Sequence, residues 1–360
     1  MQFTKTVTPL RKLSLTRMRA ALCIAVMNHK GGCGKTSLID AFAHVLMRMG
    51  FRVLIIDCDP QCNLSSRLGI TDYDYNGIGR VDELFNAINR ENYLSRLDDL
   101  PINIMYPEKH MRENKHDTTE MGVIGLIAGS PNCEVYAASA KKLCTGGLAA
   151  ERLREMVAHY KQYYDFVLID TAPSIQDNAL NETIVNVVDE MIVPFDGAEA
   201  ATGLSLFMRW LKYATSENKK LSPIFVLSKY QADTKDILAA LTGSGDTKFE
   251  GEERSSVFRS MKTIMGPHVC NHGIQELRVL RSHTFIGMKP TEQKPYVSLT
   301  KELLRRLKVN RANSVTFWFE NKIQEKLLKE MSILEGLRQR NVSVSMGKYL
   351  FRSDSMEEVP

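Results

Sequence analysis

The residues from Lys30 to Ser37 have the types and the spacing of a loop that binds phosphate. Glycines in such a loop let backbone N–H groups converge on phosphate oxygens, because no Cβ stands in the way. Lys35 would neutralise the β and γ phosphates of a nucleotide, and the Thr36 hydroxyl would bind Mg²⁺. The predicted nucleotide-binding residues are Gly31, Gly32, Cys33, Gly34, Lys35, Thr36 and Ser37.

The segments on either side of this loop have the pattern that a phosphate-binding loop needs. The apolar run from Ala21 to Met27 predicts a buried strand before it, and apolar residues recur at helical spacing after it. The positive end of that helix dipole would face the phosphates. The usual pattern is G-x-x-x-x-G-K-[ST], but His29 stands at the first glycine and a second lysine, Lys30, begins the loop.

Two acidic motifs also follow predicted strands. Asp170 ends the apolar segment 166–169, at the position of a residue that holds Mg²⁺ through water. Asp57 and Asp59 follow the apolar segment 53–56, and strand alternation puts their carboxylates on the same side. One can lie near Mg²⁺ while the other orients the attacking water. Such a pair is chemically sufficient, because phosphoryl transfer mainly needs positioning and charge neutralisation.

These motifs require a fold that brings strand ends together. Further apolar segments at 190–194 and 224–228 predict two more strands, and helical segments separate all of them. This alternation predicts an α/β fold with a doubly wound, mostly parallel sheet and helices on both faces. Ligands of such folds bind at the carboxyl ends of the strands, where all three motifs fall.

The sequence K-G-G-x-G-K-[ST], with D-x-D-P-Q and the strand that ends at Asp170, resembles the ParA/MinD family of deviant Walker A ATPases. It resembles ParA-type partition ATPases more than MinD, over about residues 21–310. The resemblance implies ATP and Mg²⁺ as cofactors, a homodimer formed on ATP, and a Lys30 that reaches the nucleotide of the partner. It implies that Asp59 activates water. The implied catalytic residues are Lys30, Lys35 and Asp59, and the implied metal ligands are Thr36, Asp57 and Asp170.

The segment after the strand predicted at 224–228 bears on which nucleotide is bound. A guanine-reading N-K-x-D loop would offer an aspartate to the base, but Ser228 and Gln231 stand at its first and last positions. ATP is therefore favoured over GTP. Ser228 is the candidate for a contact with adenine.

A cluster of basic residues lies between positions 278 and 311, opposed by Glu292 and Glu302. Such a cluster suits phosphate contacts without sequence reading, although a solvated helix face is the alternative. ParA-like proteins bind DNA without sequence preference as ATP dimers, so the resemblance implies duplex DNA and a ParB-like centromere- or cargo-binding protein as partners. The predicted DNA-binding residues are Arg278, Arg281, Lys301, Arg305, Arg306 and Lys308.

The amino-acid composition bears on the cellular compartment of the protein. The chain has 360 residues, a net charge of +5 and seven scattered cysteines with no C-x-x-C pair, which is typical of reduced cytosolic thiols. Every apolar stretch is far shorter than the ~20 residues that span a bilayer, and Asp354, Glu357 and Glu358 near the C-terminus argue against a membrane helix. We expect a cytoplasmic, nucleoid-associated protein.

The predicted organisation has four parts. Residues 1–20 form a basic arm, for which a transit peptide is the alternative, and residues 21–310 form the ATPase domain with a surface excursion at 71–122. Residues 311–345 form a helical extension and 346–360 a flexible tail.

We expect an ATPase that segregates or positions a plasmid or chromosome. Positioning of a protein cargo, as by MinD-like or organelle-positioning ATPases, is the alternative within the class. A pseudo-ATPase switch and an iron–sulfur reductase of the nitrogenase-reductase type remain outside it. The reductase would need paired cysteines at a dimer axis, for which Cys133 and Cys144 are the candidates.

Overall fold

The computed structural model describes the central part of the chain in segments. They are residues 21–49, 51–70, 80–83, 97–104, 122–133, 135, 148–173, 179–196, 200–214, 221–230, 265, 268–275, 285, 288 and 290–309. The predicted basic arm, helical extension and flexible tail lie outside these residues. No helix in the described segments is long and apolar enough to cross a membrane.

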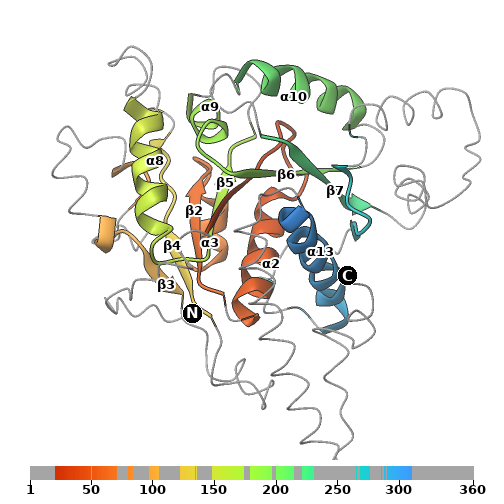
Figure 1. The fold of residues 1–360 in the computed structure, drawn as a ribbon, viewed down its shortest axis with the longest axis horizontal. Coiled ribbons are helices and arrows are strands. Elements are labelled where there is room, and N and C mark those ends of the chain that lie inside the picture. Colours follow the sequence, from red (N-terminus) through yellow and green to blue (C-terminus); the bar gives the residue numbers. More distant parts are fainter. Residues whose placement is uncertain are drawn as a thin grey trace, which may run out of the picture.

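A central sheet of eight strands organises the domain (Figure 1). Its spatial order is β3-β4-β2-β5-β1-β6-β7-β8, and the β3–β4 pair is antiparallel while the others are parallel. The strands are β1 (Leu22–Val26), β2 (Val53–Cys58), β3 (Ile102–Ile104), β4 (Ile124–Ile127), β5 (Phe166–Thr171), β6 (Glu190–Phe195), β7 (Pro223–Tyr230) and β8 (Ile274–Gln275). This arrangement confirms the predicted doubly wound α/β fold.

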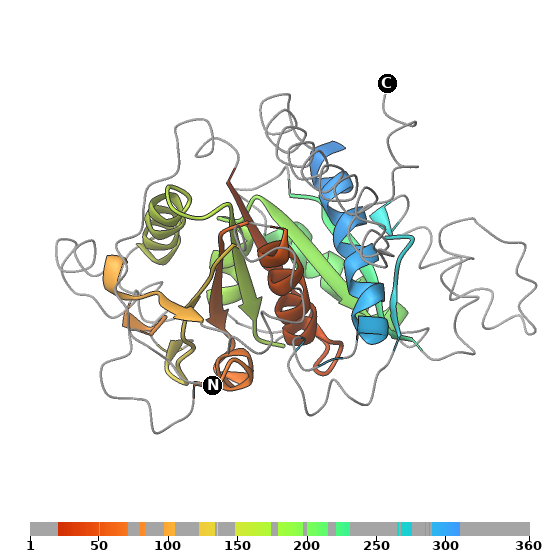
Figure 2. The same cartoon turned by 90° about the horizontal axis from the view of Figure 1, so that it is seen from below.

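Helices cover both faces of the sheet. They are α2 (Lys35–Arg48), α3 (Asn63–Arg67), α8 (Leu148–Tyr160), α9 (Ala179–Val185), α10 (Ala200–Ala214) and α13 (Pro290–Val309). Side chains of α2, α3 and α13 share one buried apolar cluster, and those of α8, α9 and α10 share the other. Figures 1 and 2 show α2 and α13 lying side by side on the first face.

The strands are apolar on both sides because each alternate residue enters a different core. In β1, Leu22 and Ile24 pack toward α2 and α13, whereas Cys23 and Ala25 pack toward the opposite helices. Every residue of β1, β2 and β5 is buried. Because helices cover both faces of these strands, their sequences are apolar at successive positions and do not alternate with polar residues.

The prediction of a surface excursion over 71–122 is wrong for part of that range. Residues 97–104 contain a short 3₁₀ turn (Leu97–Asp99) and strand β3, and Leu97, Ile102 and Ile104 are buried. The apolar signal of β3 consists of Ile102 and Ile104 on either side of Asn103, which is too short to separate from a loop by periodicity. Strands β4 and β8 are likewise short and were not predicted.

Candidate nucleotide-binding site

The loop between β1 and α2 has the backbone that its glycines predict. Gly32 and Gly34 have φ values of 75° and 92°, in the left-handed region that side chains disfavour. Gly34 is the N-cap of α2, and Lys35 is the first helical residue. The loop therefore delivers the first turn of α2, with its unpaired N–H groups, to the carboxyl edge of the sheet.

Asn28, which was not predicted, holds the start of this loop. Its Nδ2 donates to the Pro194 carbonyl at 2.6 Å, and its Oδ1 accepts from the Lys30 N–H at 3.0 Å. The buried Lys35 then folds back along the loop, where its Nζ donates to the carbonyls of Asn28 at 3.0 Å and Lys30 at 3.2 Å. An asparagine directly before a glycine-rich loop is the signal that could have indicated this role.

The His29 side chain explains the missing first glycine of the usual pattern. Its ring lies under α10, with centroid distances of 5.0 Å to Phe207 and 4.6 Å to Trp210. Burial, together with the charge of Lys35, lowers the pKa of His29 to about 4, so the imidazole is neutral near pH 7. The loop is thus anchored by an aromatic side chain at this position.

Thr36 and Asp170, both predicted metal ligands, meet in the structure. Thr36 Oγ1 donates to Asp170 Oδ2 at 2.9 Å. Asp170 is level with Val26 on β1 and with Asp57 on β2, so the ends of the three strands bring these side chains to one edge. A hydroxyl and a carboxylate are oxygen donors of the kind that Mg²⁺ prefers, so these residues fit the ion.

Asp57 is wholly buried, and the loop after β2 surrounds its carboxylate. Oδ2 accepts from the Ser65 N–H at 2.8 Å and the Ser65 hydroxyl at 2.6 Å, and Oδ1 accepts from the Asp59 N–H at 3.2 Å. Ser65, which was not predicted, also accepts from the Gly129 N–H at 2.8 Å. Asp57 therefore shapes the loop that carries Asp59, and direct metal ligation stays a prediction.

Asp59 is nearly buried, and its Oδ1 accepts from the Gln61 N–H at 2.9 Å. Burial raises its pKa, against the opposing effects of that hydrogen bond and of Lys35. Burial also raises the pKa of Asp57 to about 6, and burial with the charge of Asp57 raises that of Asp170 to about 8. Because burial disfavours the charged forms of these carboxyls, a cation bound near this edge would favour their ionised forms.

No three His, Cys, Asp or Glu side chains converge to hold a metal among the residues that the structure describes. Magnesium bound with a nucleotide needs only one or two carboxylates, because phosphate and water supply its other ligands. Cys133, a candidate for an iron–sulfur cluster, is buried, and its Sγ donates to the Cys58 carbonyl at 3.6 Å. Cys144 lies outside the described residues.

The first lysine of the loop, Lys30, points to the end of β6. Its Nζ lies 2.9 Å from Asp196 Oδ1, and its side chain is 40% exposed. The structure thus gives Lys30 a partner within its own chain. Its action across a dimer interface stays a prediction.

Ser228 lies behind the phosphate-binding loop, at the end of β7. Its buried hydroxyl is 2.5 Å from the Cys33 carbonyl and 3.2 Å from the Phe195 carbonyl, so it ties the loop to the neighbouring strand β6. Cys33 itself is buried, and Gly31 lies against Pro173. A contact of Ser228 with adenine stays a prediction.

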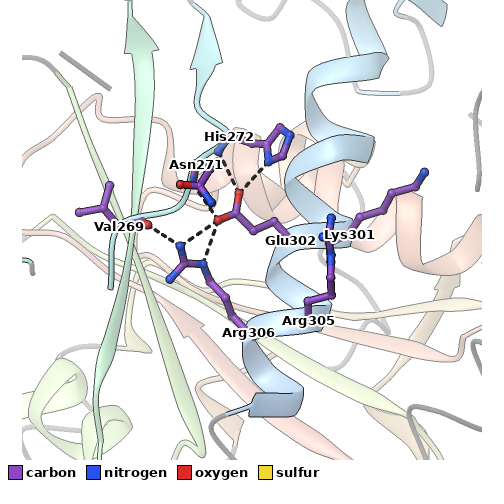
Figure 3. A network of polar contacts seen from close by, with 7 residues as sticks. All are labelled: Val269, Asn271, His272, Lys301, Glu302, Arg305 and Arg306. Carbon is purple, nitrogen blue, oxygen red and sulfur yellow. Dashed lines mark hydrogen bonds and ion pairs between the residues drawn. The ribbon is translucent and has the colours of Figure 1, made fainter. Parts of the chain in front are cut away.

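The basic residues of α13 divide into two groups. Arg306 turns inward, where it pairs with Glu302 at 2.9 Å and donates to the Val269 carbonyl at 2.5 Å (Figure 3). Arg305 is exposed, and Figure 3 shows Lys301 projecting away from the Arg306 network. Arg306 therefore holds α13 to the segment before β8, which makes it a poor DNA contact. Arg278, Arg281 and the side chain of Lys308 lie outside the described residues.

The doubly wound fold, with the glycine-rich loop and the Thr36–Asp170 contact at the carboxyl edge of its sheet, defines a P-loop nucleotide-binding domain. The family model described as an AAA domain, AAA_31, matches residues 21–223, which is more than half of the chain. The chain belongs to this family and is a P-loop ATPase of the ParA/MinD type. This confirms the resemblance on which the catalytic assignments were based.

Two curated relatives carry names of partition proteins. The chromosome-partitioning ATPase Soj of Treponema pallidum is 25% identical over 258 residues, which cover 70% of this chain and 87% of the relative. The probable plasmid-partitioning protein ParA of Thermus thermophilus is 27% identical over 215 residues, which cover 57% of each chain. This chain thus spans little more than half of the second relative.

Two solved structures share the fold. The pNOB8 ParA structure, solved bound to nonspecific DNA, has a TM-score of 0.53 and 19% identity, and covers 81% of this chain and all of its own. The structure of cobyrinic acid a,c-diamide synthase from Mycobacterium smegmatis, solved with ADP and magnesium, has a TM-score of 0.56 and 19% identity. The match covers 81% of this chain and 97% of the synthase.

Proposed function

We propose that this protein hydrolyses ATP with Mg²⁺, dimerises on ATP, binds DNA without sequence preference, and segregates or positions a plasmid or chromosome with a partner protein. The observation that carries the proposal is the contact between Thr36 and Asp170 beside the two-lysine loop. It joins the expected metal ligands to the expected phosphate cradle at one sheet edge. The partition relatives support the cellular role.

The chemistry follows from what each side chain can do. Lys35 would leave the loop carbonyls to neutralise the β and γ phosphates, and the N–H groups of the first turn of α2 would bind phosphate oxygens. Thr36 and Asp170 would hold Mg²⁺, which supplies charge neutralisation when bound. Asp59, on the loop shaped by Asp57 and Ser65, would orient the attacking water.

Dimerisation and DNA binding are the further parts of the proposal. The partly exposed Lys30 would leave Asp196 to reach the nucleotide of the partner. DNA would lie along the α13 face that carries the half-buried Lys301 and the exposed Arg305, because accessible cations on one helix give affinity through phosphate contacts. Two such faces in an ATP dimer would bind more tightly than one. The DNA-bound structure of pNOB8 ParA supports DNA as the track.

The test compares three proteins: wild type, Lys35→Ala and Asp59→Ala. We expect slow Mg²⁺-dependent ATP hydrolysis in the wild type, no tight ATP binding in Lys35→Ala, and an ATP-bound dimer without hydrolysis in Asp59→Ala. The Asp59→Ala protein with ATP should bind random-sequence duplex DNA far more tightly than wild type with ADP. Equal DNA affinity in ATP and ADP would contradict the positioning function. Wild-type hydrolysis by Asp59→Ala would contradict the assigned role of Asp59.

A further inference from the structure

Arg67, the last residue of α3, reaches across to the first turn of α2. Its Nη1 donates to Ser37 Oγ at 2.8 Å, and its Nε lies 3.5 Å from Asp40 Oδ2. The side chain is only 16% exposed. A guanidinium is therefore held beside the helix end at which the nucleotide phosphates would bind.

A buried carboxylate fixes the position of this guanidinium. Asp40 is fully buried, and its Oδ2 also accepts from the Phe285 N–H at 2.9 Å. His44 Nδ1 lies 2.9 Å from Asp40 Oδ1. Because the carboxylate is held from several sides, Arg67 is anchored at one end and presents Nη1 to Ser37 at the other.

The contact with Arg67 determines what the Ser37 hydroxyl can do. A serine hydroxyl has one hydrogen to donate and lone pairs to accept with. When Oγ accepts from a guanidinium, its hydrogen remains available and the O–H group is polarised. Among the described residues no acceptor is seen for that hydrogen. Ser37 is the third residue of α2 after its N-cap Gly34, within the turn whose dipole attracts anions.

We propose that Arg67 is a positioning residue for the nucleotide: it directs the Ser37 hydroxyl, and adds positive charge, toward the α-phosphate. This rests on the proposed nucleotide site. Lys35 and Thr36 would serve the β and γ phosphates and Mg²⁺, so the remaining hydroxyl of the first turn is left for the phosphate nearest the nucleoside. Arg67 also belongs to the helix that follows the Asp59 loop, so it ties that loop to the phosphate-binding helix.

The test measures the dissociation constant of fluorescent N-methylanthraniloyl-ADP for wild type, Arg67→Gln, Ser37→Ala and the double variant. If Arg67 acts through Ser37, each single change weakens binding roughly tenfold and the double change weakens it little further. Arg48→Gln is the matched control, because Arg48 donates to Gln293 Oε1 at 2.7 Å, at the far end of α2. It should leave the ADP affinity unchanged.

A second measurement separates positioning from a general loss of structure. The two diastereomers of ADPαS carry sulfur in place of one α-phosphate oxygen, and one of them should bind wild type several-fold more weakly than ADP. That penalty should disappear in Arg67→Gln and Ser37→Ala. If thermal unfolding shows that Arg67→Gln is not folded, Ser37→Ala carries the test, because it keeps the contact between Arg67 and Asp40.

The outcomes distinguish this inference from the proposed function. If wild type binds neither ADP nor ATP, the proposed function fails, and this inference fails with it. If wild type binds ADP while the Arg67 variants bind it equally well, or the two losses simply add, the Arg67 role is refuted and the ATPase proposal stands.

Discussion

Lys30 Nζ forms an ion pair with Asp196 Oδ1 at 2.9 Å, which links the start of the phosphate-binding loop to the end of β6. The pair lies near the surface, where the side chains are 40% and 23% exposed. If Lys30 acts across a dimer interface, this contact must break first. Under the proposed function, Asp196 would therefore compete with the nucleotide of the partner for the same ammonium group.

We expect Asp196→Asn to favour the ATP dimer. A partly exposed ion pair contributes about 0.2–1 kcal/mol and a dimer opens two of them, so the dimer dissociation constant should fall by up to about thirtyfold. Sedimentation velocity with ATP in an Asp59→Ala background measures this without hydrolysis. Asp196→Glu keeps the charge and serves as the control. A weaker dimer in Asp196→Asn would show that Asp196 supports the interface instead.

The two groups of basic residues on α13 predict different variant effects. Lys301→Glu with Arg305→Glu should weaken binding to all duplex sequences alike, and each lost phosphate contact should lower the salt slope by about 1. Basal ATP hydrolysis should remain near the wild-type rate. Fluorescence anisotropy across a salt series measures the effect. Unchanged DNA affinity would place the interface elsewhere.

Arg306→Gln should behave as a stability variant. Arg306 binds the largely buried Glu302 and the Val269 carbonyl, so its loss leaves a charged group without part of its compensation. We expect a loss of roughly 1–3 kcal/mol in the free energy of unfolding. Thermal and urea unfolding would reveal it. Arg305→Gln, one residue away on the exposed side, is the matched control and should change stability little.

The same network predicts acid sensitivity. Burial would raise the pKa of Glu302, but hydrogen bonds from His272, from the Asn271 N–H and from Arg306 outweigh it and lower the pKa to about 2. Since the folded-state pKa lies below the unfolded value, ionised Glu302 stabilises the fold above about pH 4.5 and that stabilisation is lost as pH falls toward 2. Glu302→Gln should flatten this part of the stability curve. An unchanged slope between pH 5 and 3 would contradict the assignment.

The left-handed Gly34 predicts a backbone effect at the phosphate site. A side chain at φ 92° is strained, so Gly34→Ala should cost about 1–2 kcal/mol in stability or shift the loop. Because Gly34 caps α2, a shifted loop would also weaken ADP binding. Gly203→Ala is the control, since this helical glycine has open space around its Cβ position and should gain slightly. Calorimetric titration measures the ADP affinity of both glycine variants.

Local sequence was enough to predict the long strands, the phosphate-binding loop and the acidic strand ends. The continuous apolar runs of β1, β2 and β5 are typical of strands covered on both faces of a sheet, and the glycines permit the left-handed backbone that the loop adopts. Strand β3 escaped prediction because three residues carry no usable period. It forms an edge strand only because β4 is there to pair with it.

Tertiary structure decided which side chains meet. Thr36 and Asp170 are 134 positions apart, and Lys30 and Asp196 are 166 apart, so no local pattern could pair them. The same holds for Arg306. In the sequence it is one of several cations in a basic cluster, whereas in the fold it contacts Glu302 and the Val269 carbonyl. Residue type determines what chemistry a side chain can perform, whereas the packing of distant segments determines which partners it has, because burial and charge at each position depend on the whole chain.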